Sequence, residues 1–326
     1  MKAIVVAGTK EEPKLVWQET EDVGYGPDEV LVAVRATAVN RADLSQARGN
    51  YPPPPGASEI LGLEMAGVIT AVGPNVRGWQ VGDRVCALLP GGGYAEQTAV
   101  PAGMLMRLPE DWTFVMGTAV PEVWFTAFIN LFWEGELQEG ETALIHAGAS
   151  GVGTAAIQLA RAAGARVFVT ASAEKLASCR ALGAEVAIDY KAEDFVTAVS
   201  TATNGEGVDV ILDPVGGSYL DRNVRSLRRF GRLVNIGTLG GVQGEMNTGL
   251  LLGKRLKIVG STLRTRPLPE KIAITQEFTE RFWPGLRSGE LRPIIDRTFP
   301  IAQAQQAHEY VAQNKNVGKV VLVVGE

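Results

Sequence analysis

Cysteine is almost absent from this sequence, and the shortage limits both the compartment and the metal chemistry. Only Cys86 and Cys179 occur among the 326 residues, and neither has a second Cys or a His close to it in the chain. Two isolated cysteines build neither a disulfide framework nor a structural zinc cluster. We therefore expect a protein of a reducing compartment, the cytoplasm.

An excess of positive charge is also lacking. The chain has 31 Lys and Arg against 36 Asp and Glu, a net charge of −5. Without a large positive field it has little attraction for phosphate backbones, so nucleic acid is not expected to be its main partner. The densest basic cluster, which fits a solvated corner between a helix and a strand equally well, consists of Arg225, Arg228, Arg229 and Arg232.

The N-terminal apolar run and the uncharged run at 142–160 both suit a membrane poorly. The N-terminus becomes polar by residues 9–12, too soon for the core of a signal peptide. Residues 142–160 carry no charge, but Gly148, Ser150 and Gln158 make a poor lipid-facing helix. We expect no membrane partner. A chain that is 46% hydrophobic and 21% charged is typical of globular proteins, and its length allows about two domains.

The first 120 residues have the pattern of a β-rich domain. Residues 29–38, 65–72 and 81–89 are short runs rich in β-branched residues, separated by glycines. Glycines supply the positive φ angles of tight turns and bulges. The pattern predicts a small, strongly bent barrel.

After Pro121 the pattern changes to strands alternating with helices, which is typical of a parallel sheet with right-handed crossovers. Helices are predicted at 152–163 and 174–182. Six strands, the full doubly wound number, are predicted at 142–146, 166–170, 185–188, 208–213, 231–236 and 256–260. The last 60 residues are expected to return to the first domain. We therefore predict one domain from 1–122 with 263–326 and another from 123–262.

The strand at 142–146 leads into the sequence Gly148-Ala-Ser150-Gly151-Val152-Gly153 and then into a long apolar helix. Small residues let the backbone approach a pyrophosphate, and the helix N-terminus offsets its charge. Ser150 occupies the usual middle glycine of this motif. We expect Ser150, Gly151, Val152 and Gly153 to hold the pyrophosphate of a dinucleotide.

The end of the second strand discriminates between the two nicotinamide dinucleotides. An NAD enzyme places a carboxylate there, on the ribose 2′-hydroxyl. Here the sequence is Thr170-Ala171-Ser172, and Lys175 follows. This pattern favours NADPH, because a lysine attracts the 2′-phosphate and a carboxylate repels it. Glu174 argues against this interpretation unless it points to solvent, and Lys175 could be a surface residue.

Several blocks resemble the zinc-free quinone oxidoreductase branch of the medium-chain dehydrogenase/reductase superfamily, and most closely the p53-inducible quinone oxidoreductase-like proteins. The blocks are 40–44, 51–56, 61–64, 88–93, 146–153 and 314–319. The resemblance runs essentially end to end. It implies an α/β protein with a GroES-like β-barrel catalytic domain and a doubly wound, six-stranded parallel Rossmann domain that binds NADPH.

In zinc-dependent relatives the catalytic metal is held by a Cys near the Asn40 block and by a His where this chain has Leu63. The only histidines here, His146 and His308, have no nearby thiolate, so we expect no catalytic zinc. Reduction of a simple ketone or aldehyde to an alcohol needs a Lewis acid or a strong proton donor. A quinone or conjugated enone is already electrophilic, and correct positioning suffices for it.

The resemblance also implies roles for single residues on the substrate side. Asn40, as an amide donor, and Tyr51, through its hydroxyl, would bond an acceptor oxygen. Asn40 could instead cap a turn, and Tyr51 could staple the proline loop 52–55. Trp124 and Phe125 would be flat walls of the substrate pocket, or simply core residues. Leu263 and Arg264 follow the sixth strand and would face the nicotinamide.

The remaining implied residues contact the cofactor. Thr126 would lie near the nicotinamide ribose, and Gly237 at the carboxyl edge of the sheet. Ser172, Lys175 and Tyr190 would surround the 2′-phosphate, although Tyr190 could be a surface residue. Asn316 would reach the adenosine phosphate. We interpret His146, on a buried strand, as a satisfied core histidine without a catalytic role.

Three functions compete at this point. The first is an NADPH-dependent, zinc-independent reductase of small planar quinones, by hydride or single-electron transfer. The second is an NADPH-dependent enone or 2-alkenal (enoyl) reductase, and the third is a non-catalytic, crystallin-like or RNA-associated NADPH-binding protein.

Residues 256–262 form the edge of the predicted sheet and must be covered. The resemblance implies that this edge pairs with its twin in a second copy, so we expect a homodimer through it.

Overall fold

The computed structural model of the protein describes residues 1–325. It divides into two compact units, which are residues 1–125 with 263–326 (unit 1) and residues 126–262 (unit 2). The boundary at 125/126 falls within one helix, α3 (Pro121–Phe128). The helical segment Phe114–Glu134 is long and apolar enough to cross a membrane, but 72% of its most apolar window is buried, as in a core helix.

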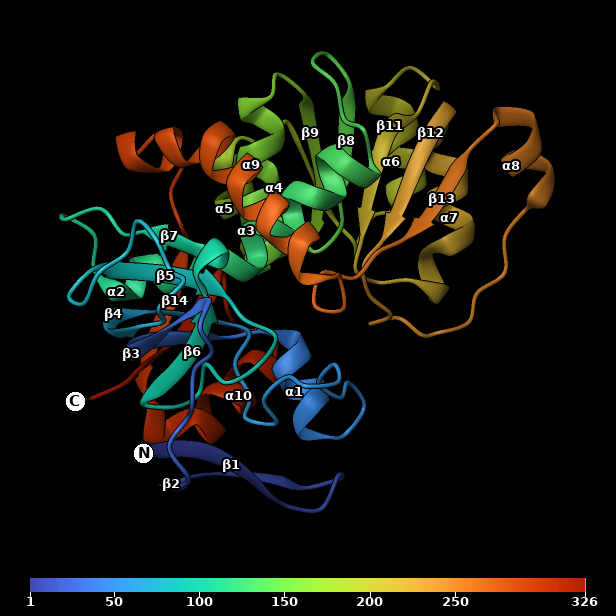
Figure 1. The fold of residues 1–326 in the computed structure, drawn as a ribbon. Helices are drawn as coiled ribbons and strands as arrows, with labels where there is room; N and C mark the ends of the chain where they lie inside the picture. The colour runs from blue at the N-terminus through green and yellow to red at the C-terminus, as the bar shows by residue number, and fades with distance from the viewer. Residues whose placement is uncertain (326) are drawn as a thin grey trace. The chain divides into compact units, whose positions relative to one another are not determined.

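Unit 2 contains a six-stranded sheet in which every neighbouring pair is parallel. Its order is β10-β9-β8-β11-β12-β13, so the chain starts in the middle and winds outward in both directions (Figure 1). The strands are β8 (Thr142–Ile145), β9 (Arg166–Ala171), β10 (Val186–Asp189), β11 (Val208–Asp213), β12 (Leu227–Asn235) and β13 (Lys257–Gly260). The predicted doubly wound sheet is confirmed, although β12 starts four residues earlier than expected, before a bulge opposite Val208.

Helices cover this sheet because each crossover presents an apolar face to it. α4 packs against α5, and α6 packs against α7. The core contains Leu144, Phe168, Ile211 and Leu233 from the strands and Phe195 from α6. The helical elements are η2 (Ile129–Glu134, a π-helix), α4 (Gly151–Ala162), η3 (Ala173–Lys175), α5 (Leu176–Leu182), α6 (Phe195–Ala202), η4 (Gly217–Tyr219), α7 (Leu220–Ser226) and α8 (Thr248–Lys254).

Unit 1 is built on a seven-stranded, mostly antiparallel sheet. The path is β14-β15-β3-β4-β5-β7, and β6 also pairs with β3. The strands are β3 (Glu29–Val39), β4 (Glu64–Val72), β5 (Arg84–Leu88), β6 (Gln97–Pro101), β7 (Leu105–Arg107), β14 (Ile295–Pro300) and β15 (Lys319–Val323). A separate hairpin is formed by β1 (Lys2–Gly8) and β2 (Pro13–Glu19). β15 pairs with β3, so the end of the chain returns to this unit as expected.

The bending of the long strand β3 lets one strand take part in three pairings. Its register with β4 shifts twice, between Leu31 and Val32 and between Val34 and Ala36. Bulges of this kind increase strand twist and curvature. The helical elements of this unit are α1 (Arg41–Ala47), η1 (Ala102–Met104), α2 (Phe114–Thr118), α9 (Leu268–Ser288), η5 (Ile301–Gln303) and α10 (Ala304–Ala312).

Candidate active site

The glycine loop of unit 2 has the geometry of an anion site. β8 ends at Ile145, and α4 begins at Gly151 behind the N-cap Ser150, whose Oγ accepts a hydrogen bond from Gly153 N at 3.0 Å. A Cβ on Gly153 would lie 2.4 Å from the carbonyl oxygen of Ala147. The first N–H groups of a helix have no acceptor within it, and the dipole adds positive potential. The loop therefore fits the pyrophosphate of a dinucleotide.

Just after the end of β9 lie Ser172, which was predicted to contact the 2′-phosphate, and Glu174, which argued against NADPH. Ser172 is buried, and its Oγ donates a hydrogen bond to Glu174 Oε1 at 2.6 Å. That bond lowers the pKa of Glu174. Glu174 is exposed, as expected, but its carboxylate also accepts the bond from Ser172. A carboxylate thus lies where either a 2′-hydroxyl or a 2′-phosphate would be recognised.

Lys175 and Tyr190 lie beside this position. Lys175 is half-buried at the end of η3, and Tyr190 follows β10 with a 44% exposed side chain. The N–H of Tyr190 donates to the carbonyl of Ala171 at 3.3 Å, which places the tyrosine next to the end of β9. The structure therefore brings Ser172, Lys175 and Tyr190 to the carboxyl ends of two neighbouring strands.

His146 is held in the core of unit 2 by neutral partners. Its Nδ1 lies 2.9 Å from Thr170 Oγ1, and its Nε2 lies 2.8 Å from Asn223 Oδ1. Burial lowers the pKa of His146 to about 4. Asn223 in turn donates to Asp213 Oδ2 at 2.9 Å. These contacts agree with the interpretation of His146 as a satisfied core histidine.

In unit 1, Asn40 belongs to a buried polar network that the sequence did not predict. Asn40 Nδ2 donates to Glu64 Oε1 at 2.9 Å, and Asn40 Oδ1 accepts from Lys319 Nζ at 2.6 Å. Lys319 also bonds Glu64 Oε1 at 2.7 Å, and the side chains of this ion pair are 3% and 0% exposed. The expected role of Asn40 as an amide donor to an acceptor disagrees with these bonds, because its amide is already satisfied inside the unit.

Asn40 lies at the N-cap position of α1, but the capping bond there comes from the Asp43 side chain and not from the side chain of Asn40. Its N–H donates to Asp43 Oδ2 at 2.8 Å where α1 begins, and Gly62 N donates to Asp43 Oδ1 at 3.0 Å. Burial raises the pKa of Asp43 to about 6. Glu64 Oε2 accepts from Glu122 N at 2.9 Å, at the start of α3. The network thus joins α1, α3, β4 and β15.

Tyr51 and Arg264 are brought together in unit 1 from distant parts of the chain. Arg264 Nη1 donates to the carbonyl oxygen of Tyr51 at 3.2 Å, and its guanidinium carbon lies 5.3 Å from the centre of the Tyr51 ring. Tyr51 is half-buried, and burial raises the pKa of its hydroxyl. Among residues 1–325 this hydroxyl has no hydrogen-bond partner, so it can bond a ligand.

The remaining predicted residues have other surroundings. Trp124 and Phe125 are 1% and 0% exposed, and the ring of Phe125 lies 5.0 Å from that of Phe278. This burial favours the core interpretation over the pocket walls. Leu263 is buried just before Arg264. Three predicted cofactor residues remain. The carbonyl oxygen of Thr126 accepts a hydrogen bond from Asn130 Nδ2, and Gly237 lies just after β12, beside Pro214. Asn316 Nδ2 donates to the carbonyl oxygen of Gly318 at 2.7 Å.

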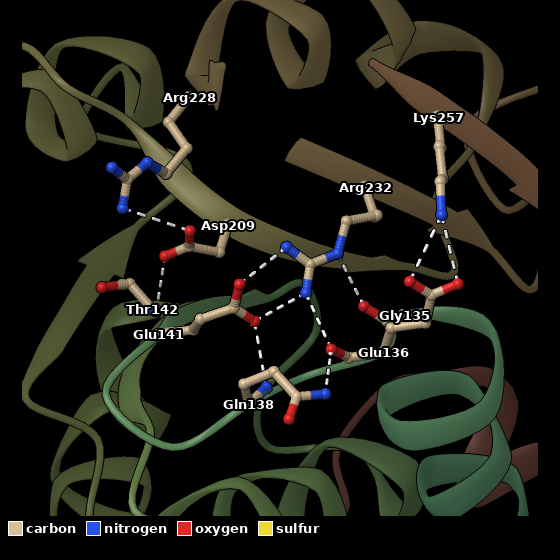
Figure 2. A network of polar contacts seen from close by, with 9 residues as sticks. All are labelled: Gly135, Glu136, Gln138, Glu141, Thr142, Asp209, Arg228, Arg232 and Lys257. Atoms are coloured by element: carbon tan, nitrogen blue, oxygen red, sulfur yellow. Dashed lines mark hydrogen bonds and ion pairs between the residues drawn. The ribbon is translucent and has the colours of Figure 1, made fainter. Parts of the chain in front are cut away.

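The basic cluster of unit 2 is largely neutralised by carboxylates. Arg232 donates to both oxygens of Glu141, at 2.9 and 2.6 Å, and to the carbonyls of Gly135 and Glu136 (Figure 2). Arg228 bonds Asp209 at 3.2 Å in the same view. Arg225 pairs with Asp221 at 2.6 Å. Among the described residues only Arg229 of this cluster, which is exposed beside the Phe230 ring, has no carboxylate partner, so the cluster offers little free positive charge to a nucleic acid.

The donor atoms of the described chain do not fit the zinc site of metal-dependent dehydrogenases. No group of three or more His, Cys, Asp or Glu side chains suited to a metal ion occurs in the part of the chain that the structure describes. Cys86 and Cys179 are buried in different units, and burial raises the pKa of Cys179 to about 11. Zinc requires thiolates or imidazoles that converge on one point.

Family models match both units of the chain. Residues 26–110 match the "Alcohol dehydrogenase GroES-like domain", and residues 151–279 match "Zinc-binding dehydrogenase", beginning at the glycine loop. The chain also resembles part of a much longer modular enzyme. The pikromycin polyketide synthase component PikAII of Streptomyces venezuelae is 36% identical over 308 residues, which are 92% of this chain but 8% of that protein.

A relative of similar size is the human synaptic vesicle membrane protein VAT-1 homolog, 31% identical over 92% of this chain and 80% of that protein. Many solved structures share the fold, and three of them are informative here. A quinone oxidoreductase of Pseudomonas syringae pv. Tomato is 30% identical with a TM-score of 0.88, covering 99% and 100% of the two chains. The CurK enoyl reductase is 29% identical with a TM-score of 0.87, covering 99% and 98%. A mycobacterial protein complexed with NADPH is 28% identical with a TM-score of 0.88, covering 99% and 100%.

Proposed function

Because this chain belongs to the medium-chain dehydrogenase/reductase superfamily of oxidoreductases, we propose that it reduces small planar quinones with NADPH and without zinc. When bound, the dinucleotide supplies the hydride or the electrons. Ser150 and the N-terminus of α4 hold its pyrophosphate, and the Tyr51 hydroxyl bonds the acceptor oxygen. The likeness to a quinone oxidoreductase supports this proposal.

The observation that carries the proposal is the closed Asn40–Glu64–Lys319 network. Asn40 and Glu64 belong to the blocks in which zinc-dependent relatives place metal ligands, and here the ammonium group of Lys319 satisfies the Glu64 carboxylate at 2.7 Å. Without a metal to stabilise an alkoxide, the acceptor must be electrophilic by itself. This condition selects quinones and conjugated enones over simple ketones.

A second acceptor class has its own support. The likeness to the CurK enoyl reductase favours the reduction of a carbon–carbon double bond conjugated to a carbonyl. Another relative is a polyketide synthase component. The chain spans only 8% of that synthase, so a role in polyketide assembly is not implied. We retain enoyl or 2-alkenal reduction as the alternative function.

Steady-state oxidation of NADPH tests the two functions. We expect turnover of 1,2-naphthoquinone that is unchanged by EDTA and reduced in Tyr51→Phe, because the variant lacks the hydroxyl. Turnover of a 2-alkenal alone would replace the first function by the second. Tight NADPH binding without turnover of either acceptor would favour the third function, a non-catalytic NADPH-binding protein, and salt-dependent binding of RNA would extend it.

The choice of NADPH needs a separate test because Glu174 opposes it. We infer that Lys175 attracts the 2′-phosphate and that Glu174 leaves Ser172 when the phosphate binds. Lys175→Gln should lower the NADPH-to-NADH ratio of kcat/KM about 10-fold, and Glu174→Gln should raise it. The control is Lys14→Gln, an exposed lysine on β2 of unit 1, which should leave the ratio unchanged. A wild-type preference for NADH that Glu174→Gln abolishes would assign Glu174 to the 2′-hydroxyl of NAD.

We also propose a homodimer through β13. This strand ends the sheet of unit 2, and Ile258 on it is 38% exposed. An unpaired edge strand invites pairing with a second copy. Light scattering should give twice the chain mass, and Ile258→Lys should give the mass of one chain. A wild-type protein of single mass would overturn the proposal.

A further inference from the structure

Arg264 is a buried cation that has no acidic partner. It is 5% exposed, and its guanidinium donates to three neutral oxygens, Pro90 O at 2.8 Å, Gln46 Oε1 at 2.7 Å and Tyr51 O at 3.2 Å. Throughout residues 1–325 no carboxylate forms an ion pair with it. A buried charge without a counter-charge costs several kcal/mol, roughly, so its retention needs an explanation.

The guanidinium also has donors to spare. It carries five N–H groups in a planar fork, and the three bonds to Pro90, Gln46 and Tyr51 use one N–H each. One N–H on each of the two terminal nitrogens therefore remains available. Two N–H groups of such a fork match the geometry of a negatively charged oxygen or carboxylate.

The surroundings increase the positive potential at this point. Lys271 Nζ donates to the carbonyl oxygen of Arg264 at 3.3 Å, and Lys271 itself has no ion pair within the described chain. Burial lowers the pKa of Arg264, and the nearby Tyr51, Asp43 and Glu59 oppose this only in part. Arginine stays charged at neutral pH even so. The Tyr51 hydroxyl, which is also without a partner among the described residues, adds a neutral donor from the loop that follows α1.

We propose that Arg264 binds a negatively charged oxygen of the acceptor. The inference rests on the proposed function and specifies its substrate class. When the acceptor carbon gains a hydride from the dihydronicotinamide, which is oxidised, the π electron pair moves onto the conjugated carbonyl oxygen. That oxygen carries the negative charge of an enolate until it takes a proton from solvent; a quinone then loses a proton from the carbon that received the hydride and takes one on its second oxygen, which gives the hydroquinone. A fixed cation in a buried site stabilises this charge without reorganisation.

The negatively charged oxygen that Arg264 binds could also belong to a permanent anionic group of the acceptor. The two sources are separated by comparing neutral 1,2-naphthoquinone with 1,2-naphthoquinone-4-sulfonate. If Arg264 stabilises an oxygen that becomes negative during the reaction, Arg264→Met should lower kcat about 100-fold with both acceptors. If Arg264 instead binds a fixed anionic group, Arg264→Met should raise KM for 1,2-naphthoquinone-4-sulfonate alone. Arg264→Lys keeps the charge and should restore part of either loss.

Arg266→Met is the matched control, because Arg266 lies two residues away and its charge is already compensated by Glu270. This variant should keep kcat and KM within twofold of the wild type. The proposal is overturned if Arg264→Met, with an unchanged melting temperature and dinucleotide affinity, also stays within twofold for both acceptors.

A binding measurement separates this inference from the proposed function. Tryptophan fluorescence reports the binding of 2-naphthoate, an unreactive planar anion, without any turnover. Arg264→Met should weaken the binding of 2-naphthoate about 10-fold and leave that of neutral 2-naphthol unchanged. If the wild type reduces no acceptor but this difference is found, the proposed function fails and the anion site stands. Equal binding of 2-naphthoate by the two proteins would contradict the anion site.

Discussion

Arg232 in unit 2 and Arg264 in unit 1 are both buried, 8% and 5% exposed, but they have opposite surroundings. Arg232 meets both oxygens of Glu141 as well as two backbone carbonyls, and Figure 2 shows how these acceptors surround its guanidinium. Arg264 meets only neutral oxygens. The first arrangement is complete in the folded chain, whereas the second is complete only with an anion. Burial alone therefore does not distinguish a structural arginine from one that binds a ligand.

The largest predicted effect extends the comparison to Lys319, a compensated cation in the same unit as Arg264. Lys319→Met leaves the fully buried Glu64 without its counter-charge and should lower the free energy of unfolding by about 4 kcal/mol. The double variant Lys319→Met/Glu64→Gln should recover much of this loss, because no charge remains buried. Urea unfolding measures both, and equal losses in the single and double variants would contradict the account.

Arg232→Met should cost somewhat less, about 2 to 3 kcal/mol, since the Glu141 side chain is 23% exposed and water can screen part of its charge. The matched control is Arg228→Met in the same cluster. Arg228 is 45% exposed, so its loss should cost less than about 1 kcal/mol. Thermal melts of the two variants test this order, which would be wrong if Arg228→Met were the less stable protein.

Arg264→Met should change the free energy of unfolding by less than about 1 kcal/mol, in either direction. The variant removes a buried charge together with its desolvation cost, and it leaves no carboxylate unpaired. Three neutral acceptors lose a donor, which offsets part of the gain. A loss as large as that of Arg232→Met, measured in the same urea titration, would show that the two arginines do not differ in kind.

The smallest effect concerns the two histidines, one in each unit. Burial lowers the pKa of His146 to about 4 and that of His308 to about 3. The unfolded chain takes up these protons near pH 6.5, so their contribution to stability is complete above this pH and is lost as the pH falls towards 4. Asp43, whose pKa burial raises to about 6, acts in the opposite direction. In proton NMR spectra neither imidazole should titrate between pH 8 and pH 5; a midpoint near 6.5 would contradict the burial.

The sequence allowed the elements of unit 2 to be predicted because the information is local. Alternation of strands and helices indicated the parallel sheet, and the spacing of Gly148, Ser150 and Gly153 indicated the loop before α4. The network of Asn40, Glu64 and Lys319 was not predictable in this way. Asn40 and Lys319 lie 279 positions apart, and only the pairing of β15 with β3 brings them together.

The orientation of single side chains was also beyond local reasoning. Glu174 was expected to point to solvent, and a rotamer that bonds Ser172 leaves no trace in the sequence. The aromatic pair Trp124 and Phe125 could line a pocket or fill a core, and the position of Phe278 on α9 decides this. Arg264 was expected in the pocket by resemblance, but its missing counter-charge became visible only in the fold.

The central claim is that the charge of Arg264 serves a bound acceptor and not the folded state. The most direct test measures two quantities on one preparation of Arg264→Met, the free energy of unfolding and kcat/KM for 1,2-naphthoquinone. We predict an unfolding free energy within about 1 kcal/mol of the wild type and a kcat/KM about 100-fold lower. The claim would be contradicted if the variant were less stable by about 3 kcal/mol or more and still turned over the quinone like the wild type.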